Sequence, residues 1–276
     1  MPGSLAAAPA RIASIAWLGA ENALALGVAP VGVADAAYYR QRMAHPPLPE
    51  GVADLGPFWE PNLERLLALR PDLILVDAWS VVDGGRLAEI ARVERIPAYP
   101  QGSGGWDFAI GTLRHLGGML DREALAGQVA AAAESRIAEL RRRAEAAGAP
   151  PVYVGLLARG GRNVTLYGGP GLVGGVLERL GLSNAHAGPF SAAGTATVGL
   201  DALAREPGAV ILCIDLATAS GDFARSIAGN ALWRSLPAVR GGRFGLLAGF
   251  YPFGGLGSAM HFAEQAVRIL EARGRG

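Results

Sequence analysis

The chain has 276 residues, of which 51% are hydrophobic and 18% are charged, and its mean hydropathy is +0.27. This length fits one large domain or two lobes, and so much apolar side chain excludes an intrinsically disordered segment. The 25 basic and 24 acidic residues leave a net charge of +1, which excludes a basic field for nucleic acid or for an anionic membrane surface. No apolar run reaches the ~18 residues of a membrane span.

Short apolar strands alternate with helices in the N-terminal part. We predict strands over residues 11–17, 30–35 and 73–78, and helices over 21–26 and 61–69, with Pro61 in the first turn of the second helix. This alternation favours a parallel sheet with helices on its faces. The carboxyl ends of the strands should then meet at one edge of the sheet, where α/β proteins bind ligands.

A long helix is predicted in the middle of the chain. A helix of about a dozen residues begins at Trp106, and the stretch 121–147 lacks proline and is rich in Ala, Glu and Arg, with Asp121 as a possible cap and Gly148 as a possible end. About 27 residues at ~1.5 Å each give a helix of roughly 40 Å. We therefore predict an N-terminal α/β lobe over 1–120, a rigid connecting helix over 121–148 and a C-terminal α/β lobe over 149–276.

The two lobes share one pattern. Residues 63–77 are predicted to form a helix, a proline turn, an apolar strand and an acid, and residues 200–215 repeat that order. Asp77 and Asp215 should therefore lie at the carboxyl ends of equivalent strands. Duplicated lobes joined by a stiff helix favour a ligand held between them.

Motifs for catalysis are scarce. The four histidines are scattered and show no metal-binding spacing, the single Cys213 lies in an apolar run, and no nucleophile elbow or phosphate-binding Walker loop occurs. Gly169, Gly171 and Gly174 match G-x-G-x-x-G after a predicted strand. Pro170 inside the turn, and the lack of a well-placed acid, favour a tight strand-to-helix turn over a dinucleotide site.

Aromatic and arginine side chains gather at predicted strand ends and in loops, which favours a shallow site for a large, partly apolar ligand. The alternative is that several of them merely seal the contact between lobes. The group consists of Trp17, Tyr38, Tyr39, Arg42, Phe58, Trp59, Trp79, Trp106, Arg159, Arg162, Phe190, Phe250, Tyr251 and Phe253.

The sequence also resembles a known family along nearly its whole length. The similar segments include Ala25–Asp35, Pro46–Pro49, Glu60–Glu64, Leu232–Pro237 and Ser258–Phe262. In these segments the chain is similar to the periplasmic ferric hydroxamate siderophore-binding proteins, which are class III substrate-binding components of ABC importers. The resemblance implies an α/β fold of two Rossmann-like lobes, bridged by one long helix, with a cleft that holds an iron–siderophore complex.

The resemblance also implies a set of ligand-binding residues, although the family's hydroxamate-binding set is not kept here. Phe58 stands where the family has its key arginine, the partner tyrosine falls near Trp79 and Ser80, and the C-lobe tryptophan falls at Ala193. Arg42 aligns with a cleft tryptophan and could supply the positive charge. The expected ligand-binding residues are Trp17, Tyr39, Arg42, Phe58, Trp59, Trp79, Ser80, Trp106, Arg159, Phe190, Tyr251 and Phe253.

The resemblance further implies docking to an ABC importer permease in the inner membrane through one acidic residue on each lobe. Glu60 matches the first; Gly175 stands at the second position, and Glu178, about one helical turn further on, could replace it.

The expected protein is thus a monomeric periplasmic receptor for an iron(III)–siderophore of hydroxamate type, and not an enzyme. We expect no cofactor and no metal ligands from the protein, because the siderophore itself encloses Fe(III). We expect the export signal to be absent from this sequence, since residues 1–17 lack a basic segment and a continuous apolar core. The alternatives are a catecholate siderophore, haem or a corrinoid as ligand, or an NAD-dependent two-lobed enzyme.

Overall fold

The computed structural model describes residues 9, 11–43, 45–97, 104–158, 161–215, 227 and 229–273. By its internal contacts the chain divides into two units. The N-terminal unit comprises Met1–Arg40, Pro46–Ala98 and Ile110–Ala131, and the C-terminal unit comprises Gln41–His45, Tyr99–Ala109 and Ala132–Gly276.

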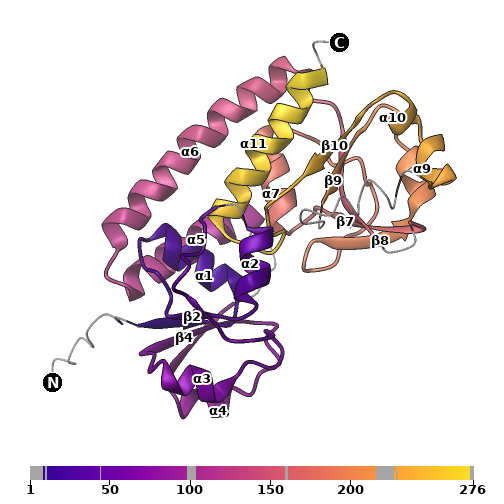
Figure 1. Cartoon of the computed structure of the whole chain (residues 1–276). Helices are drawn as coiled ribbons and strands as arrows, with labels where there is room; N and C mark the ends of the chain where they lie inside the picture. Colours follow the sequence, from indigo (N-terminus) through magenta and orange to yellow (C-terminus); the bar gives the residue numbers. More distant parts are fainter. Residues whose placement is uncertain are drawn as a thin grey trace. The chain divides into compact units, whose positions relative to one another are not determined.

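The N-terminal unit is built on a five-stranded sheet in the order β3-β2-β1-β4-β5, with every neighbouring pair parallel (Figure 1). Its strands are β1 (Ile12–Ser14), β2 (Gly32–Val33), β3 (Ala53–Asp54), β4 (Leu73–Asp77) and β5 (Arg92–Ile96). The intervening helices are α1 (Trp17–Ala25), α2 (Ala36–Arg42), α3 (Leu63–Ala68) and α4 (Gly84–Ala88). The predicted parallel sheet is therefore confirmed, and all five strands end at the same edge.

Two local predictions in this unit are wrong. The first strand ends at Ser14, and α1 already begins at Trp17, because the hydroxyl of Ser14 donates to the carbonyl of Ala16 and closes a tight turn there. Pro61 precedes α3, since Asn62 caps that helix by accepting a hydrogen bond from the backbone N–H of Arg65.

Two long helices follow, α5 (Gly105–Met119) and α6 (Glu123–Ala146). The expected long helix is present, although it starts two residues after Asp121, which has a positive φ of 56° and is no cap. Gly148, with a φ of 88°, lies just past the end of α6 as expected. The boundary between the two units lies within α6, between Ala131 and Ala132.

The C-terminal unit contains a mixed sheet in the order β10-β9-β6-β7-β8. Its strands are β6 (Val152–Leu157), β7 (Asn163–Tyr167), β8 (Thr195–Gly199), β9 (Val210–Ile214) and β10 (Phe244–Leu247). Besides parts of α2, α5 and α6, its described helices include α7 (Leu172–Leu180), the 3₁₀ helix η1 (Leu200–Ala204), α9 (Ala231–Ser235), α10 (Pro237–Arg240) and α11 (Leu256–Arg273). Strands β9 and β10 run parallel to β6. β7 is antiparallel to both neighbours. Residues 158–162, which join it to β6, are too few for a parallel crossover.

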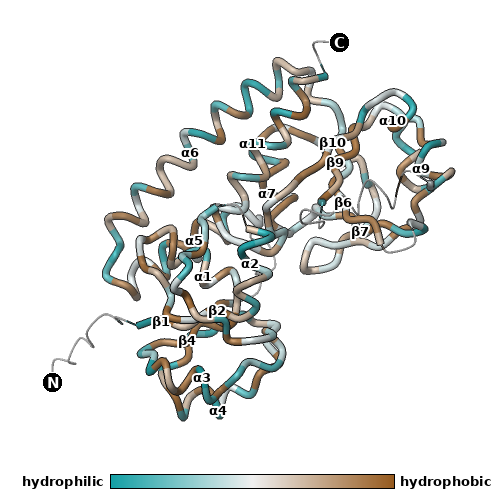
Figure 2. The backbone as a smooth tube through the Cα atoms, in the orientation of Figure 1, coloured by the Kyte–Doolittle hydropathy of each residue, from teal (hydrophilic) through white to brown (hydrophobic). Residues whose placement is uncertain are grey.

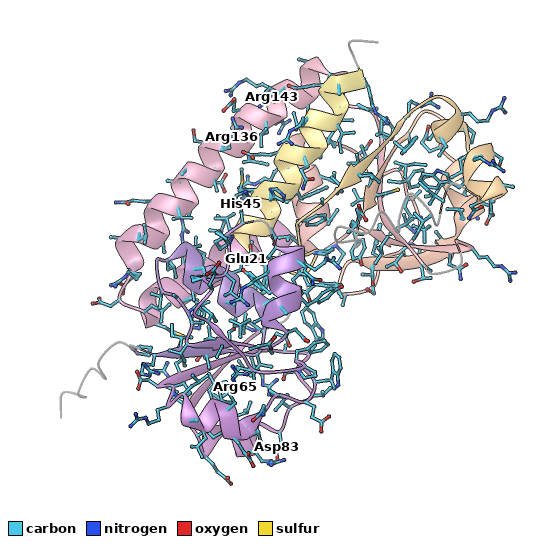
Figure 3. The ribbon with its side chains drawn as sticks, in the orientation of Figure 1. Glu21, His45, Arg65, Asp83, Arg136 and Arg143 are labelled. Atoms are coloured by element: carbon cyan, nitrogen blue, oxygen red, sulfur yellow. The ribbon has the colours of Figure 1, made fainter. Side chains whose placement is uncertain are left out.

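Both sheets are apolar inside. Figure 2 shows hydrophobic segments around β6 and β9, and every residue of β9, Cys213 included, is buried. On the outside of the C-terminal unit, α6 and α11 lie side by side (Figure 1) and are joined by ion pairs of Arg136 with Glu264 and of Arg143 with Glu271. Figure 3 labels both arginines along α6. Trp233 is buried, and its ring centroid lies 5.7 Å from that of Phe244.

Candidate functional site

The carboxyl edge of the N-terminal sheet carries exposed aromatic side chains. Among the described residues, the large aromatic side chains that stand exposed are Tyr38, Phe58, Trp59 and Trp79, with 44–56% of their surface accessible. All four lie in the segments that follow β2, β3 and β4. Because these strands are parallel, the aromatic residues share one edge of the sheet. We call these four residues the aromatic edge.

Trp17 and Tyr39 support the aromatic edge from behind. The half-buried indole of Trp17 donates to the carbonyl of Ala34 over 3.0 Å, and its ring lies 5.4 Å from that of Tyr38 and 5.5 Å from that of Tyr39. Tyr39 is fully buried and its hydroxyl donates to the carbonyl of Pro46. Burial raises the pKa of Tyr39, as does the charge of Glu21. Tyr39 is thus a packing residue, and the exposed ring is that of Tyr38, which the expected ligand set did not include.

Aspartates at the strand ends hold these loops. The carboxylate of Asp35 accepts from the backbone N–H of Phe58 over 3.0 Å, and that of Asp54 accepts from the N–H groups of Ala37 and Gly56. The rings of Phe58 and Trp59 then meet edge to face, 5.0 Å apart. Side-chain acceptors of this kind fix a turn in place of regular ladder bonds. The rings of Phe58 and Trp59 are therefore presented by a loop with a defined backbone.

Asp77 holds Trp79 in the same manner. It is the last residue of β4, as predicted, and its Oδ1 accepts from the N–H of Trp79 over 3.1 Å. Burial raises the pKa of Asp77, while hydrogen bonds from the backbone of Trp79 and Ser80 and the charge of Arg95 act in the opposite direction. The half-buried Ser80 accepts from the backbone of Val82, so its hydroxyl is part of this turn.

A second aromatic group lies in the C-terminal unit. Tyr251 and Phe253 follow β10, and their rings are 5.6 Å apart; Phe253 also lies 6.0 Å from Tyr167 at the end of β7. Arg42, which belongs to this unit, is 7% exposed, and its charge acts on the phenol of Tyr167. Sequence reasoning missed Tyr167; its position at the end of a strand, before Gly168 and Gly169, was the available signal.

Two predicted ligand residues are used in packing. Trp106 is buried; its indole donates to Glu134 over 2.7 Å, and the guanidinium of Arg179 lies 5.5 Å from its ring centroid. Phe190 packs against the core of its unit, with its ring 5.0 Å from that of His186. Trp106 is thus 2% exposed and held by Glu134 and Arg179, and its role in ligand binding stays a prediction. Arg159 lies outside the described residues.

The glycines at 169–174 form the predicted strand-to-helix turn between β7 and α7. Gly169 has a φ of 53°, and a Cβ at Gly174 would lie 2.0 Å from the carbonyl oxygen of Gly169. A Cβ at Gly171 would lie 3.0 Å from the carbonyl oxygen of Ala193, and one at Gly105 would overlap the backbone of Gly171. The protein's own backbone thus occupies the space that these glycines leave, which favours a structural turn.

The two acids expected at a docking surface are both exposed. Glu60 lies in the loop before α3 and Glu178 lies on α7. Gly175 is buried, and a Cβ there would lie 2.4 Å from the backbone nitrogen of Trp106, so no acidic side chain fits at that position. Glu178 is therefore the acid that α7 presents in this region.

The residues that the structure describes hold neither a candidate metal site nor a candidate membrane span. No three His, Cys, Asp or Glu side chains in this part of the chain come together in a way that could hold a metal ion. No helix in it combines the length and apolarity that crossing a bilayer requires.

Known proteins are similar to this chain in sequence and in fold. Residues 12–248 match the family model of the periplasmic binding proteins. The iron(3+)-hydroxamate-binding protein FhuD of Escherichia coli (strain K12) is 32% identical over 265 residues, which cover 95% of this chain and 86% of that protein.

Among solved structures, the siderophore-binding protein FhuD from Vibrio cholerae with bound Fe³⁺–Desferal superposes with a TM-score of 0.87 at 29% identity, over 95% of this chain and 98% of that one. The catecholate-siderophore binding protein VctP from Vibrio cholerae has a TM-score of 0.71 at 19% identity, over 96% and 94% of the two chains, and shows the fold alone. With its two α/β units and these relatives, the chain belongs to the periplasmic binding protein family.

Proposed function

We propose that this protein is a periplasmic receptor that binds a ferric siderophore of hydroxamate type and delivers it to an ABC importer. The aromatic edge is the observation that carries the proposal, together with the 32% identity to the hydroxamate-binding FhuD. Large aromatic side chains that gather on an accessible edge favour a binding surface, and a siderophore offers a large, partly apolar ligand for it.

The protein has to recognise and bind the ferric siderophore. The siderophore fills the coordination sphere of Fe(III) with its own oxygens, so the receptor needs aromatic contact surface and a few hydrogen-bond donors, with no metal ligands of its own. Arg42 is the donor that we assign to the C-terminal unit, and Tyr251 and Phe253 supply aromatic surface in the same unit. We propose no catalytic step and no resident cofactor.

Quenching of tryptophan fluorescence tests the ligand class. Ferric ferrioxamine B and ferrichrome should quench saturably, because an iron complex beside Trp59 or Trp79 accepts the excitation energy. Ferric enterobactin, haem, cobalamin and NAD serve as competing probes. Saturable quenching by one of these four, with none by the hydroxamates, would replace the proposed ligand.

Two variants test the aromatic edge. About half of Trp79 is exposed, roughly 100 Å² of an indole, so full burial by a ligand is worth up to about 2.5 kcal/mol. Trp79→Ala should therefore weaken siderophore binding by tenfold or more. Leu67→Ala, which removes another exposed apolar side chain, on α3, should leave the affinity unchanged. Equal affinities of Trp79→Ala and the parent would remove Trp79 from the site.

Docking to the permease is proposed through Glu60 and Glu178. Glu60→Arg should leave ligand binding intact and impair siderophore uptake by cells, whereas Glu50→Arg, an exposed acid in another loop of the same unit, should leave both unchanged. Normal uptake with Glu60→Arg would exclude Glu60 from docking. We also propose that the receptor acts as a monomer in the periplasm, which sedimentation and cell fractionation would test.

A further inference from the structure

The hydroxyl group of Tyr167 stands apart from those of the other buried tyrosines. Tyr39, Tyr153 and Tyr167 are all at least nine-tenths buried. The hydroxyl of Tyr39 donates to the carbonyl of Pro46, and that of Tyr153 donates to the carbonyl of Ala202. Within the described part of the chain, the hydroxyl of Tyr167 makes no hydrogen bond. Its donor and acceptor capacity is therefore not used by the described part of the protein and remains available to a bound molecule.

The Tyr167 side chain is fixed in place. Its backbone pairs with Thr195 of β8, and its carbonyl accepts from the side-chain amide of Asn184. Its ring, 8% exposed, contacts that of Phe253 edge to face. In the described chain the side-chain nitrogen and oxygen atoms that are both fully buried and unpaired are Arg243 Nε and Arg273 Nη1. The unpaired hydroxyl of Tyr167 therefore keeps access to solvent while its ring is held rigidly.

The surroundings of this hydroxyl decide whether it donates a hydrogen bond as a neutral phenol or coordinates a metal as a phenolate. Burial raises the pKa of Tyr167, and the positive charge of Arg42 opposes this effect without cancelling it. The phenol thus stays protonated near neutral pH and can donate a hydrogen bond. Arg42, itself nine-tenths buried, adds a positive charge that favours an electron-rich acceptor in the same place.

We infer that the hydroxyl of Tyr167 is a ligand-binding group, which donates a hydrogen bond to an iron-bound oxygen of the siderophore beside the guanidinium of Arg42. The inference rests on the proposed function and adds to it a residue that favours ligands with an oxygen acceptor at this position. The ring contacts to Phe253 and Tyr251 hold the donor in position and supply apolar surface next to it.

The test compares two tyrosines on adjacent strands. Tyr167→Phe removes only the hydroxyl group and should weaken the binding of ferric ferrioxamine B by about 2- to 12-fold, the range for one hydrogen bond. Its melting temperature should equal that of the parent, because no protein hydrogen bond is lost. Tyr153→Phe is the matched control: it loses the bond to Ala202, so its melting temperature should fall while its affinity stays the same.

The outcomes separate this inference from the proposed function. If the parent protein binds no ferric hydroxamate, the proposed function fails. If the parent binds but Tyr167→Phe binds equally well, only the role of Tyr167 is refuted. The visible spectrum of the bound complex gives a further check: loss of a charge-transfer band in Tyr167→Phe would mean that the phenolate coordinates iron, and would overturn the assignment as a donor.

Discussion

Replacement of Gly175 by alanine tests how closely α7 packs on the start of α5. A Cβ at Gly175 would lie 2.4 Å from the backbone nitrogen of Trp106 and 2.9 Å from that of Gly105. Both neighbours are backbone atoms in the first turn of α5, so they cannot move aside as a flexible side chain would. The added methyl group must therefore push the two helices apart.

The magnitude follows from two opposing effects. Overpacking of this severity costs about 3 kcal/mol, and the higher helix propensity of alanine returns about 1 kcal/mol. The net loss of about 2 kcal/mol should lower the melting temperature by about 4–8 °C for a protein of this size.

Gly127→Ala is the matched control. Gly127 lies on the exposed side of α6, and nothing stands within 4 Å of a Cβ there. Only the difference in helix propensity then acts, so the free energy of unfolding of this variant should rise by about 1 kcal/mol and its melting temperature by about 2–4 °C. Circular dichroism on heating would measure both. A Gly175→Ala variant that melts as high as Gly127→Ala would refute the packing geometry, and with it the reason why Glu178 rather than residue 175 is the exposed acid of α7.

Two further variants have pH-dependent outcomes. Asp77→Asn keeps an acceptor for the N–H of Trp79 and removes a carboxylate whose pKa is raised by burial. At pH 7 the variant should unfold at an equal or higher denaturant concentration than the parent. The parent becomes more stable as the pH falls and this carboxylate is protonated, and the variant should lack that increase. The pKa of His261 is lowered, chiefly by burial and also by His45, against an opposing bond to Ala248; its contribution to stability is therefore present above about pH 6.5 and is lost on acidification. His261→Gln should flatten the fall in unfolding free energy below that pH in urea titrations, and an unchanged slope would contradict the burial of His261.

The fold could be predicted to the level of its elements. Alternating apolar segments and turn residues are local signals, so β4, α5 and the long helix α6 lie close to their predicted positions. The errors fall at the ends of elements, where a single side chain decides where a strand ends or a helix begins. Ser14 ended β1 early, and Asn62 rather than Pro61 set the start of α3.

The candidate site could be predicted in composition but not in exposure. The sequence placed Phe58, Trp59 and Trp79 in loops after strands, and these three rings are exposed. It could not show that Tyr39 points inward while its neighbour Tyr38 points outward. It also could not show that Trp106 is buried, because its partners Glu134 and Arg179 lie 28 and 73 positions further along the chain.

The sequence by itself determined the class of this protein: two α/β units, a long helix in the middle of the chain, and similarity to siderophore-binding proteins along nearly the whole chain. The units and the helix depend on local periodicity and composition, and the similarity depends on the order of residues in matching segments. All of these can be read from the linear sequence. The tertiary structure decided which aromatic rings reach solvent and which hydroxyl remains without a protein acceptor, as at Tyr167. Both depend on contacts between residues far apart in the chain, and the pattern of the sequence does not specify these pairings.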